Sequence, residues 1–168
     1  LASDSLDNIN QLLLDTLDSN QFSSNSFSSL ASVSVSDSEV SVSDLNFAIT
    51  SANVSTGGTS TIFSLVPGSL INAGDESQFT SLLAYETANQ VDISNQNLTV
   101  DTGTLSVSNA NLLDATTSGI VTANIAPDST VDSLATLTGT GNAYTIVIGS
   151  VDATGSTAAE LIAIDIAT

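Results

Sequence analysis

The sequence predicts a β-rich α+β fold made of degenerate strand–helix repeats, in either a solenoid-like or a sandwich-like arrangement. Three observations indicate this fold. Short runs in which valine alternates with serine are typical of half-buried strands. Apolar side chains at helical spacing follow these runs, and the same order of signals returns later in the chain. A chain of 168 residues is long enough for one module built from a few such units.

The first signals along the chain are one helix and two short strands. Residues 3–18 predict the helix, because four apolar side chains recur there at helical spacing. These side chains are Leu6, Ile9, Leu13 and Leu17. In residues 31–50, ASVSVSDSEVSVSDLNFAIT, the alternation of valine and serine changes phase between Ser36 and Glu39. The change predicts a turn or bulge between two strands, and a short capped helix is expected after them at residues 43–49.

The second helix is predicted within residues 69–89. Asp75 and Gln78 have the spacing of a capping box, in which each side chain accepts a hydrogen bond from the other residue's backbone N–H. The apolar face of this helix holds Phe79, Leu82 and Leu83. Strand-like runs follow at residues 91–100 and 104–107.

The same order of helix and strand appears twice more. Residues 108–123, SNANLLDATTSGIVTA, begin with serine, continue as an apolar helix and leave through a Ser-Gly turn into a strand. A third pass begins at residues 127–139 and continues with a strand at residues 144–148. It ends in an apolar helical segment, STAAELIAIDIAT, at residues 156–168.

We therefore expect residues 1–168 to form a single repeat-built module, with sub-repeats at about 1–62, 63–125 and 126–168. The leucines that anchor the sub-repeats lie 67 (45 to 112) and 49 (112 to 161) residues apart, so the repeat is degenerate. They are Leu45, Leu112 and Leu161. The last sub-repeat stops early, and it is expected to be truncated or to be completed by a neighbouring unit.

The charge composition excludes several classes of partner. The chain has 18 Asp plus Glu and no Lys, Arg or His, whereas about 20 Lys plus Arg would be ordinary for this length. Without a cationic side chain, nothing displaces the counterions of nucleic acid or binds an anionic membrane surface. No apolar run approaches the roughly 20 residues of a membrane span, so membrane insertion is not expected. Every carboxylate must be solvated, hydrogen-bonded by N–H or hydroxyl groups, or neutralised by an external cation.

Calcium is the candidate cofactor, because Ca²⁺ prefers hard oxygen ligands. Acidic side chains cluster at four places in the sequence, of which Asp4 with Asp7 is the first. The candidate metal ligands are the acids of the other three clusters: Asp37, Glu39 and Asp44; Asp75 and Glu76; Asp128 and Asp132. The alternative is that these acids act as helix caps, turn formers and solubilising groups.

Catalysis is not expected from this composition. Without His, Lys or Cys, a serine nucleophile has only a carboxylate as its base. The remote enzymatic alternative is a retropepsin-like aspartic protease, because Asp101, Thr102 and Gly103 match the Asp-Thr-Gly motif of that class. Such a protease needs two aspartates that share one proton, so this chain would have to dimerise. Asp-Thr-Gly is also an ordinary turn sequence.

Several segments resemble the repeats of very large bacterial surface proteins. They are LLDATTSGIVTA at residues 112–123, TLTGTG at 136–141 and AAELIAIDIAT at 158–168. The N-terminal DNINQLLLDTL and SVSVSDSEVSV are similar to the helix-then-strand units of such arrays. The nearest resemblance is to giant cell-surface proteins and adhesins of marine cyanobacteria. It implies secretion, a calcium-containing environment and a structural or adhesive role. The Gly-Gly-x-Gly-x-Asp calcium repeat of related toxins is missing, so no calcium ligand is transferred from the resemblance.

These observations predict an extracellular structural protein, as a subunit or module of a bacterial surface filament, surface layer or giant adhesin. Its expected partners are copies of itself or neighbouring repeats, which pair through apolar stripes and through strand edges at residues 32–42 or 144–148. The alternative is a calcium-dependent, lectin-like adhesin that binds surface glycans. Asn53 and Asn97 each begin an Asn-x-Ser/Thr glycosylation sequon.

Overall fold

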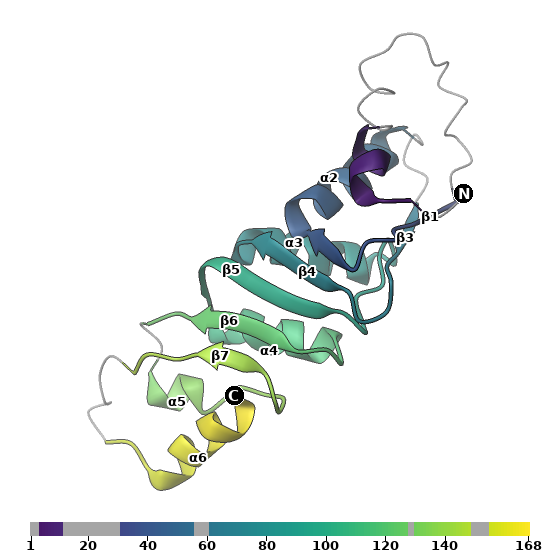
Figure 1. Ribbon diagram of the computed structural model, residues 1–168. Coiled ribbons are helices and arrows are strands. Elements are labelled where there is room, and N and C mark those ends of the chain that lie inside the picture. The colour runs from purple at the N-terminus through teal and green to yellow at the C-terminus, as the bar shows by residue number, and fades with distance from the viewer. Residues whose placement is uncertain (1–3, 12–30, 56–60, 128–129, 149–154) are drawn as a thin grey trace.

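A parallel sheet of five strands organises the computed structural model, which describes residues 4–11, 31–55, 61–127, 130–148 and 155–168. The strands stand in the sheet in the order in which they occur in the chain, from β2 at one edge to β7 at the other (Figure 1). They are β2 (Glu39–Ser41), β4 (Leu70–Gly74), β5 (Asn97–Leu105), β6 (Val121–Ile125) and β7 (Ala143–Thr145).

A second, smaller parallel ladder runs beside the N-terminal half of this sheet. It consists of β1 (Ser32–Ser34) and β3 (Ile62–Ser64). Single bridges extend it on both sides, from Asp4 to Val35 and from Phe63 to Val91. The chain therefore passes first through the small ladder and then through the large sheet before it enters each of the helices α2 and α3.

One layer of helices covers one face of the large sheet. α2 packs on β2 and β4, α3 on β4 and β5, and α4 on β5 and β6 (Figure 1). α5 and α6 pack together at the end of the molecule where β7 lies. The helices are α2 (Val42–Ser55), α3 (Glu76–Thr87), α4 (Val107–Thr116), α5 (Val131–Leu134) and α6 (Ala158–Ala167), and residues 6–11 are also helical.

The core lies between the sheet and its helices. A row of paired strand residues faces the helices and is almost fully buried: Val40, Ile71, Leu98 and Val121. The helices pack buried leucine, isoleucine and phenylalanine side chains against this row of strand residues. Burial of each such side chain stabilises the fold by roughly 1.5–3 kcal/mol. These are Leu45, Ile49, Phe79, Leu82 and Leu113. Polar residues such as Thr99 and Thr122 are paired on the other face of the sheet. This one-sided burial explains why valine and serine alternate.

The number of residues between paired positions on neighbouring strands decreases from β2 toward β7. Position 39 pairs with position 70, and position 70 in turn pairs with position 97. Further along, position 98 pairs with 121 and position 122 with 143, so that each interval is shorter than the one before it. All of these intervals are shorter than the anchor-leucine spacings, because the sub-repeat predicted at 63–125 contains β4, β5 and β6 together.

The predicted mixture of α and β structure is confirmed, and several predicted elements are present. β1 and β2 are the two strands expected around the change of phase, although they belong to different sheets. The capping box at the start of α3 is present, with Gln78 N donating to Asp75 Oδ1 and Asp75 N donating to Gln78 Oε1, both at 3.0 Å. Of the first predicted stripe, Leu6 is buried and Ile9 packs against the core, whereas Leu13 and Leu17 lie outside the described residues.

Other predicted boundaries were wrong. The helix expected at residues 43–49 runs from Val42 to Ser55, because its buried face continues through Ile49 and Ala52. The long strand-like run at 91–100 contributes only a bridge at Val91 before β5 begins at Asn97. The predicted strand at 104–107 is split, because Ser106 caps α4 and its hydroxyl accepts a hydrogen bond from Asn109 N.

Candidate interaction surface and acidic groups

Two of the three acids in the first candidate cluster, Asp37 and Glu39, accept hydrogen bonds from neutral donors. The Asp37 carboxylate accepts a hydrogen bond of 2.6 Å from Leu6 N, at the start of the helix at residues 6–11. Glu39, on the edge strand β2, accepts one of 2.6 Å from the side-chain amide of Asn72. Asp44 lies in the first turn of α2, where a negative side chain is stabilised by the helix dipole.

The second cluster holds two helix ends together. Asp75 is the N-cap of α3. The next residue, Glu76, reaches to the start of α4, where its Oε1 accepts hydrogen bonds from Ser106 N at 3.0 Å, Ser106 Oγ at 2.5 Å and the Asn109 amide at 2.7 Å. The hydrogen bond from the Ser106 hydroxyl is the main reason that the pKa of Glu76 is lowered from its usual value. Glu76 therefore acts as an ionised cap for the following helix.

The third cluster is only partly described. Asp128 lies outside the described residues. Asp132, in α5, lies near Glu160 in α6, so that a hydrogen bond joins the two carboxyl groups only when one of them is protonated. Glu160 also accepts hydrogen bonds from Thr157 N at 2.7 Å and from the Thr157 hydroxyl at 2.8 Å, and the Thr157 backbone bond is the largest cause of its lowered pKa. This pair of acids faces solvent, because Asp132 is exposed and Glu160 is partly exposed.

The described part of the chain brings no three acidic side chains together as a ligand set for a metal ion. Four of the candidate acids instead accept hydrogen bonds from backbone N–H, amide or hydroxyl donors, which is one of the three routes expected for a chain without cationic side chains. They are Asp37, Glu39, Asp75 and Glu76. Calcium binding stays a prediction. Sequence reasoning missed the contact between Glu76 and Asn109 because the two residues are 33 positions apart and no local pattern joins them.

Two further acids lie close together beside the smaller ladder. Glu86 accepts a hydrogen bond of 2.8 Å from Ile93 N, and Asp92 accepts bonds from Ser94 N and from the Ser94 hydroxyl. Burial raises the pKa of Glu86, and the negative charge of Asp92 raises it further against the effect of the Ile93 bond. The pKa of Asp92 is lowered, mainly by its bond to the Ser94 hydroxyl. Glu86 belongs to α3, and Asp92 belongs to the connection between α3 and β5.

The residues of the Asp-Thr-Gly motif lie on an exposed part of β5. Asp101, Thr102 and Gly103 are all exposed to solvent. The Asp101 carboxylate accepts a hydrogen bond of 3.1 Å from Ala73 N on the neighbouring strand β4. Asp101 thus joins two adjacent strands, and the protease alternative stays a prediction that requires a second copy.

Of the two sequon asparagines, Asn97 has both ends of its side-chain amide bonded. Its Nδ2 donates to Gly68 O at 3.2 Å, and its Oδ1 accepts from Ile120 N at 2.9 Å. The side chain therefore links three successive turns of the chain. Asn53, on α2, accepts a hydrogen bond of 2.9 Å from the Gln90 amide.

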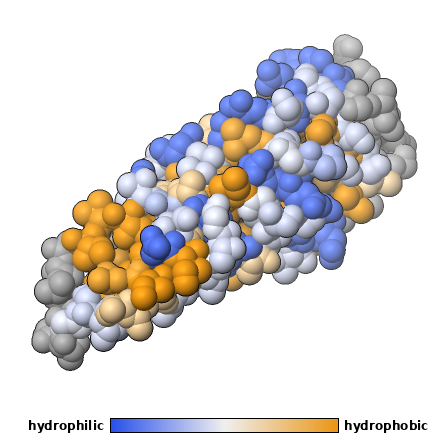
Figure 2. Space-filling model, turned by 60° about the horizontal axis from the view of Figure 1, so that its bottom comes forward, coloured by the Kyte–Doolittle hydropathy of each residue, from blue (hydrophilic) through white to orange (hydrophobic). Residues whose placement is uncertain are grey.

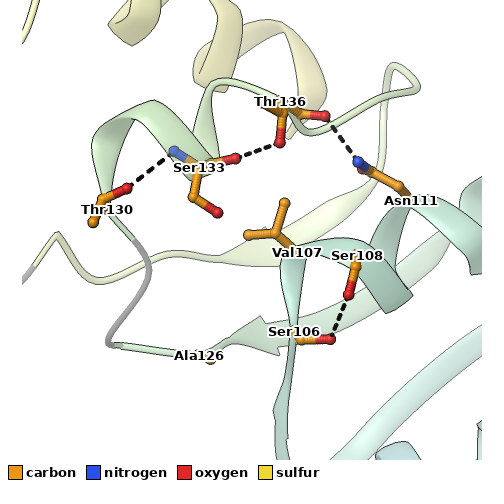
Figure 3. Close-up of a pocket in the computed structure, with 8 residues that line it drawn as sticks. All are labelled: Ser106, Val107, Ser108, Asn111, Ala126, Thr130, Ser133 and Thr136. Atoms are coloured by element: carbon orange, nitrogen blue, oxygen red, sulfur yellow. Dashed lines mark hydrogen bonds between the residues drawn. The ribbon is translucent and has the colours of Figure 1, made fainter.

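An open groove of about 520 Å³ lies between α4 and α5 (Figure 3). Its eight lining residues are Ser106, Val107, Ser108, Asn111, Ala126, Thr130, Ser133 and Thr136. None of them has a charged or titratable side chain near neutral pH, so the groove lining holds no general acid or base. Many of its polar groups bond one another: Asn111 donates to Thr136 O at 2.8 Å, and the Thr136 hydroxyl donates to Ser133 O at 2.6 Å. The groove lining is therefore a hydrogen-bonded junction between two helices.

Hydrophobic side chains gather at the end of the molecule formed by β7, α5 and α6 (Figure 2). Five of the eleven large apolar side chains that are exposed in the described residues belong to residues 147–166. They form what we call the tail surface: Val147, Ile148, Leu161, Ile162 and Ile166. β7 is also an edge strand, because within the described parts of the chain it pairs only with β6. Exposed apolar groups beside an unpaired strand edge are features of an interaction surface.

The opposite end of the sheet is built differently. There the chain begins its ladder at Asp4, and the helix at residues 6–11 follows. Leu6 is buried and its N–H is bonded by Asp37, while Asn10 donates to Asp44 O at 3.3 Å and so joins this helix to α2. The helix at residues 6–11 therefore packs on the chain through Leu6 and exposes polar side chains such as Asp7 and Asn8.

Within the described residues, no helix combines the length and the apolar character that crossing a bilayer requires. No protein-family model matches the chain, and no curated protein or solved structure matches it.

Proposed function

We propose that this chain is a structural module of an extracellular bacterial assembly, such as a surface filament, surface layer or giant adhesin, and that it self-associates. The observation that supports the proposal best is the tail surface, where five exposed apolar side chains lie at one end of the molecule. β7, an edge strand among the described residues, lies at the same end. An exposed apolar area beside a strand edge favours pairing with another chain. The resemblance to giant surface proteins and the absence of His, Lys and Cys from the sequence support the same function.

The proposal includes a solenoid rather than a sandwich. Parallel strands in chain order, with one helix layer on one face, are the arrangement that stacked strand–helix units produce. On this interpretation each strand of the large sheet with its following helix is one unit, and the interval between paired strand positions is the length of that unit. The units then become shorter toward β7, and each contacts mainly its two neighbours.

The charge of the chain makes assembly dependent on salt. At a formal charge of −18, copies repel one another at low ionic strength. At the ionic strength of seawater the screening length is about 3–4 Å, so that close packing of like-charged surfaces becomes feasible. Calcium that bridges exposed carboxylates of two copies would act in the same direction.

The test is light scattering coupled to size-exclusion chromatography, in low salt and in seawater salts, each with and without a chelator. We expect oligomers in seawater salts. The double variant Val147→Asp with Ile148→Asp should restore monomers, because it places charge beside the β7 edge, whereas Val54→Asp, on the exposed face of α2, should leave assembly unchanged. A monomer at high concentration in seawater salts would contradict the proposal, and indifference to the chelator would remove calcium from it.

A further inference from the structure

The groove between α4 and α5 interrupts the layer of helices. α3 packs on both α2 and α4, whereas α5 packs on α6. The space left between α4 and α5 is about 520 Å³ (Figure 3). Sites that bind small molecules commonly have volumes of roughly 300–1,000 Å³. The groove is therefore large enough to hold a small organic ligand.

The wall of this groove is held in place by hydrogen bonds within the chain. Asn111 Nδ2 donates to Thr136 O at 2.8 Å, and Asn111 Oδ1 accepts from Thr138 N at 2.9 Å. The Thr136 hydroxyl donates to Ser133 O at 2.6 Å. Because these groups already have partners, the wall is ordered before a ligand arrives, and binding need not pay for its ordering.

The α5 side of the groove offers hydroxyl groups that can donate. Thr130 Oγ1 accepts a hydrogen bond of 3.1 Å from Ser133 N, which leaves the Thr130 O–H for another acceptor. The Ser133 hydroxyl makes no hydrogen bond within the described residues. Figure 3 shows the Ser133 side chain pointing across the groove toward Val107. Both hydroxyl groups can therefore donate to a ligand.

The α4 side offers an acceptor. The Ser106 hydroxyl donates to Glu76 Oε1 at 2.5 Å, and the hydroxyl oxygens of Ser106 and Ser108 are 3.2 Å apart. Because Ser106 has only one O–H, Ser108 must be the donor in this second pair. The lone pairs of Ser108 Oγ then remain for a donor on a ligand. Glu76 thus orients two hydroxyl groups without lining the groove itself.

The charge of the groove and of the chain indicates a neutral ligand. No carboxylate lines the groove, so the lining holds no partner for a cation. An anion is repelled by a chain whose formal charge is −18. The apolar part of the lining is Val107 and Ala126, which can contact C–H groups. A neutral ligand with several hydroxyl groups on an aliphatic ring combines these properties.

We propose that the groove binds a neutral sugar residue. Its hydroxyl groups donate to Ser108 Oγ and accept from the hydroxyls of Thr130 and Ser133, while its C–H groups contact Val107. The lining hydroxyls that have hydrogen-bonding capacity to spare are then paired with sugar hydroxyls, which also donate and accept. The inference does not depend on self-association, and it adds a ligand site to the proposed structural module.

The test is a titration of the ¹⁵N-labelled full chain with D-glucose, D-galactose and N-acetyl-D-glucosamine, followed by NMR. We expect saturable shifts of the Ser108 and Ser133 amide signals with at least one sugar, at a dissociation constant on the order of 1 mM, because the groove is open and offers few hydrogen bonds. D-Glucuronate, which is glucose with a carboxylate, should bind more weakly than glucose. Tighter binding of glucuronate, or no saturable shift with any of the three neutral sugars, would overturn the proposal.

Two variants and a matched control locate the site. Ser108→Ala and Ser133→Ala should each weaken binding roughly three- to tenfold, because each removes one hydrogen bond to the sugar. Ser81→Ala removes an exposed serine hydroxyl of α3 outside the groove and should leave the affinity unchanged. An unchanged melting temperature shows that a variant keeps the fold. Equal affinities of all three variants and the parent would contradict the proposal.

A further titration distinguishes a free sugar from the sugar of a glycan chain. Chitotetraose is a neutral chain of N-acetyl-D-glucosamine. Tighter binding of chitotetraose than of the single sugar would show that the groove takes part of a glycan, whereas equal binding would show that it takes one sugar residue. Chitotetraose that shifts the Ser81 amide signal as much as those of Ser108 and Ser133 would place the contact outside the groove and overturn the proposal.

Discussion

At the scale of single residues, this protein shows how carboxylates are accommodated when no cationic side chain is present. The acids at helix starts accept hydrogen bonds from backbone N–H groups, either in their own helix, as Asp75 does, or in another, as Asp37 and Glu76 do. Hydrogen bonds to an ionised group are stronger than those between neutral groups, because the charge assists the bond. Unpaired N–H groups at helix starts thus take the place that lysine and arginine occupy in ordinary proteins.

Glu76 provides the residue-scale prediction. Its pKa is lowered in the folded chain, so its contribution to stability is complete above the unfolded-state pKa near 4.5 and is lost as the pH falls through the lower folded-state value. Glu76→Gln should lower the free energy of unfolding by about 1 kcal/mol at pH 7, because three hydrogen bonds to a charged acceptor are weakened. Urea unfolding at pH 7 and at pH 3 measures the effect.

The control for this experiment is Asp7→Asn, at an exposed position in the N-terminal helix. It removes one negative charge, as Glu76→Gln does, without touching the junction of α3 and α4. We expect the difference between parent and Glu76→Gln to shrink at pH 3. A difference that is the same at both pH values would mean that Glu76 does not act as an ionised cap.

At the scale of elements, local patterns were readable from the sequence and pairing between distant segments was not. The capping box of α3 was predictable, because Asp75 and Gln78 lie within one turn. The parallel pairing of β2 with β4 was not, because an alternation of valine and serine indicates one buried face in parallel and antiparallel sheets alike. The outward face of α6 was hidden for a related reason: the whole segment is apolar, and only its packing on α5 decides that Ile164 is buried and Ile162 is not.

The turns before β5 and β6 provide the prediction at this scale. They stack closely: the Thr117 hydroxyl donates to Gln96 O at 2.6 Å, and a Cβ on Gly119 would lie 2.1 Å from the same oxygen. Gly119→Ala should therefore destabilise the protein by roughly 2 kcal/mol or more, because backbone must move to relieve the clash. The melting temperature of the purified variant measures this cost.

Gly68→Ala is the matched control, in the turn before β4. Gly68 has a positive φ of 79° but no atom within 4 Å of the added Cβ, so alanine there costs only the backbone strain of about 1 kcal/mol. Gly119→Ala should lower the melting temperature more than Gly68→Ala does. The reverse order would show that the turns are not held as closely as the distance between Gly119 and Gln96 indicates.

At the scale of the whole molecule, the interactions between charged side chains are all repulsive. All 18 charged side chains are negative, so every charge–charge interaction between side chains in the folded chain is repulsive. Folding into the elongated molecule of Figure 1 brings these charges closer together than they are in the unfolded chain. In an ordinary protein, salt weakens attractive and repulsive pairs together, and its net effect on stability depends on their balance. Here the sequence contains no attractive pairs of charged side chains to weaken.

The stability of the monomer should therefore rise steadily with salt. Between about 50 mM and 1 M NaCl the screening length falls from roughly 14 Å to about 3 Å, which removes most repulsion between exposed carboxylates. We expect the melting temperature of the double variant Val147→Asp with Ile148→Asp, chosen because it is expected to be monomeric, to increase by at least about 3 °C. Roughly 1 kcal/mol produces such a shift in a chain of this size. A parallel measurement in CaCl₂ at matched ionic strength separates screening from calcium binding. A melting-temperature shift equal to that in NaCl means screening alone, and a larger shift means that calcium binds the folded chain. A melting temperature that falls with NaCl would show that repulsion among the acids does not limit the stability of this fold.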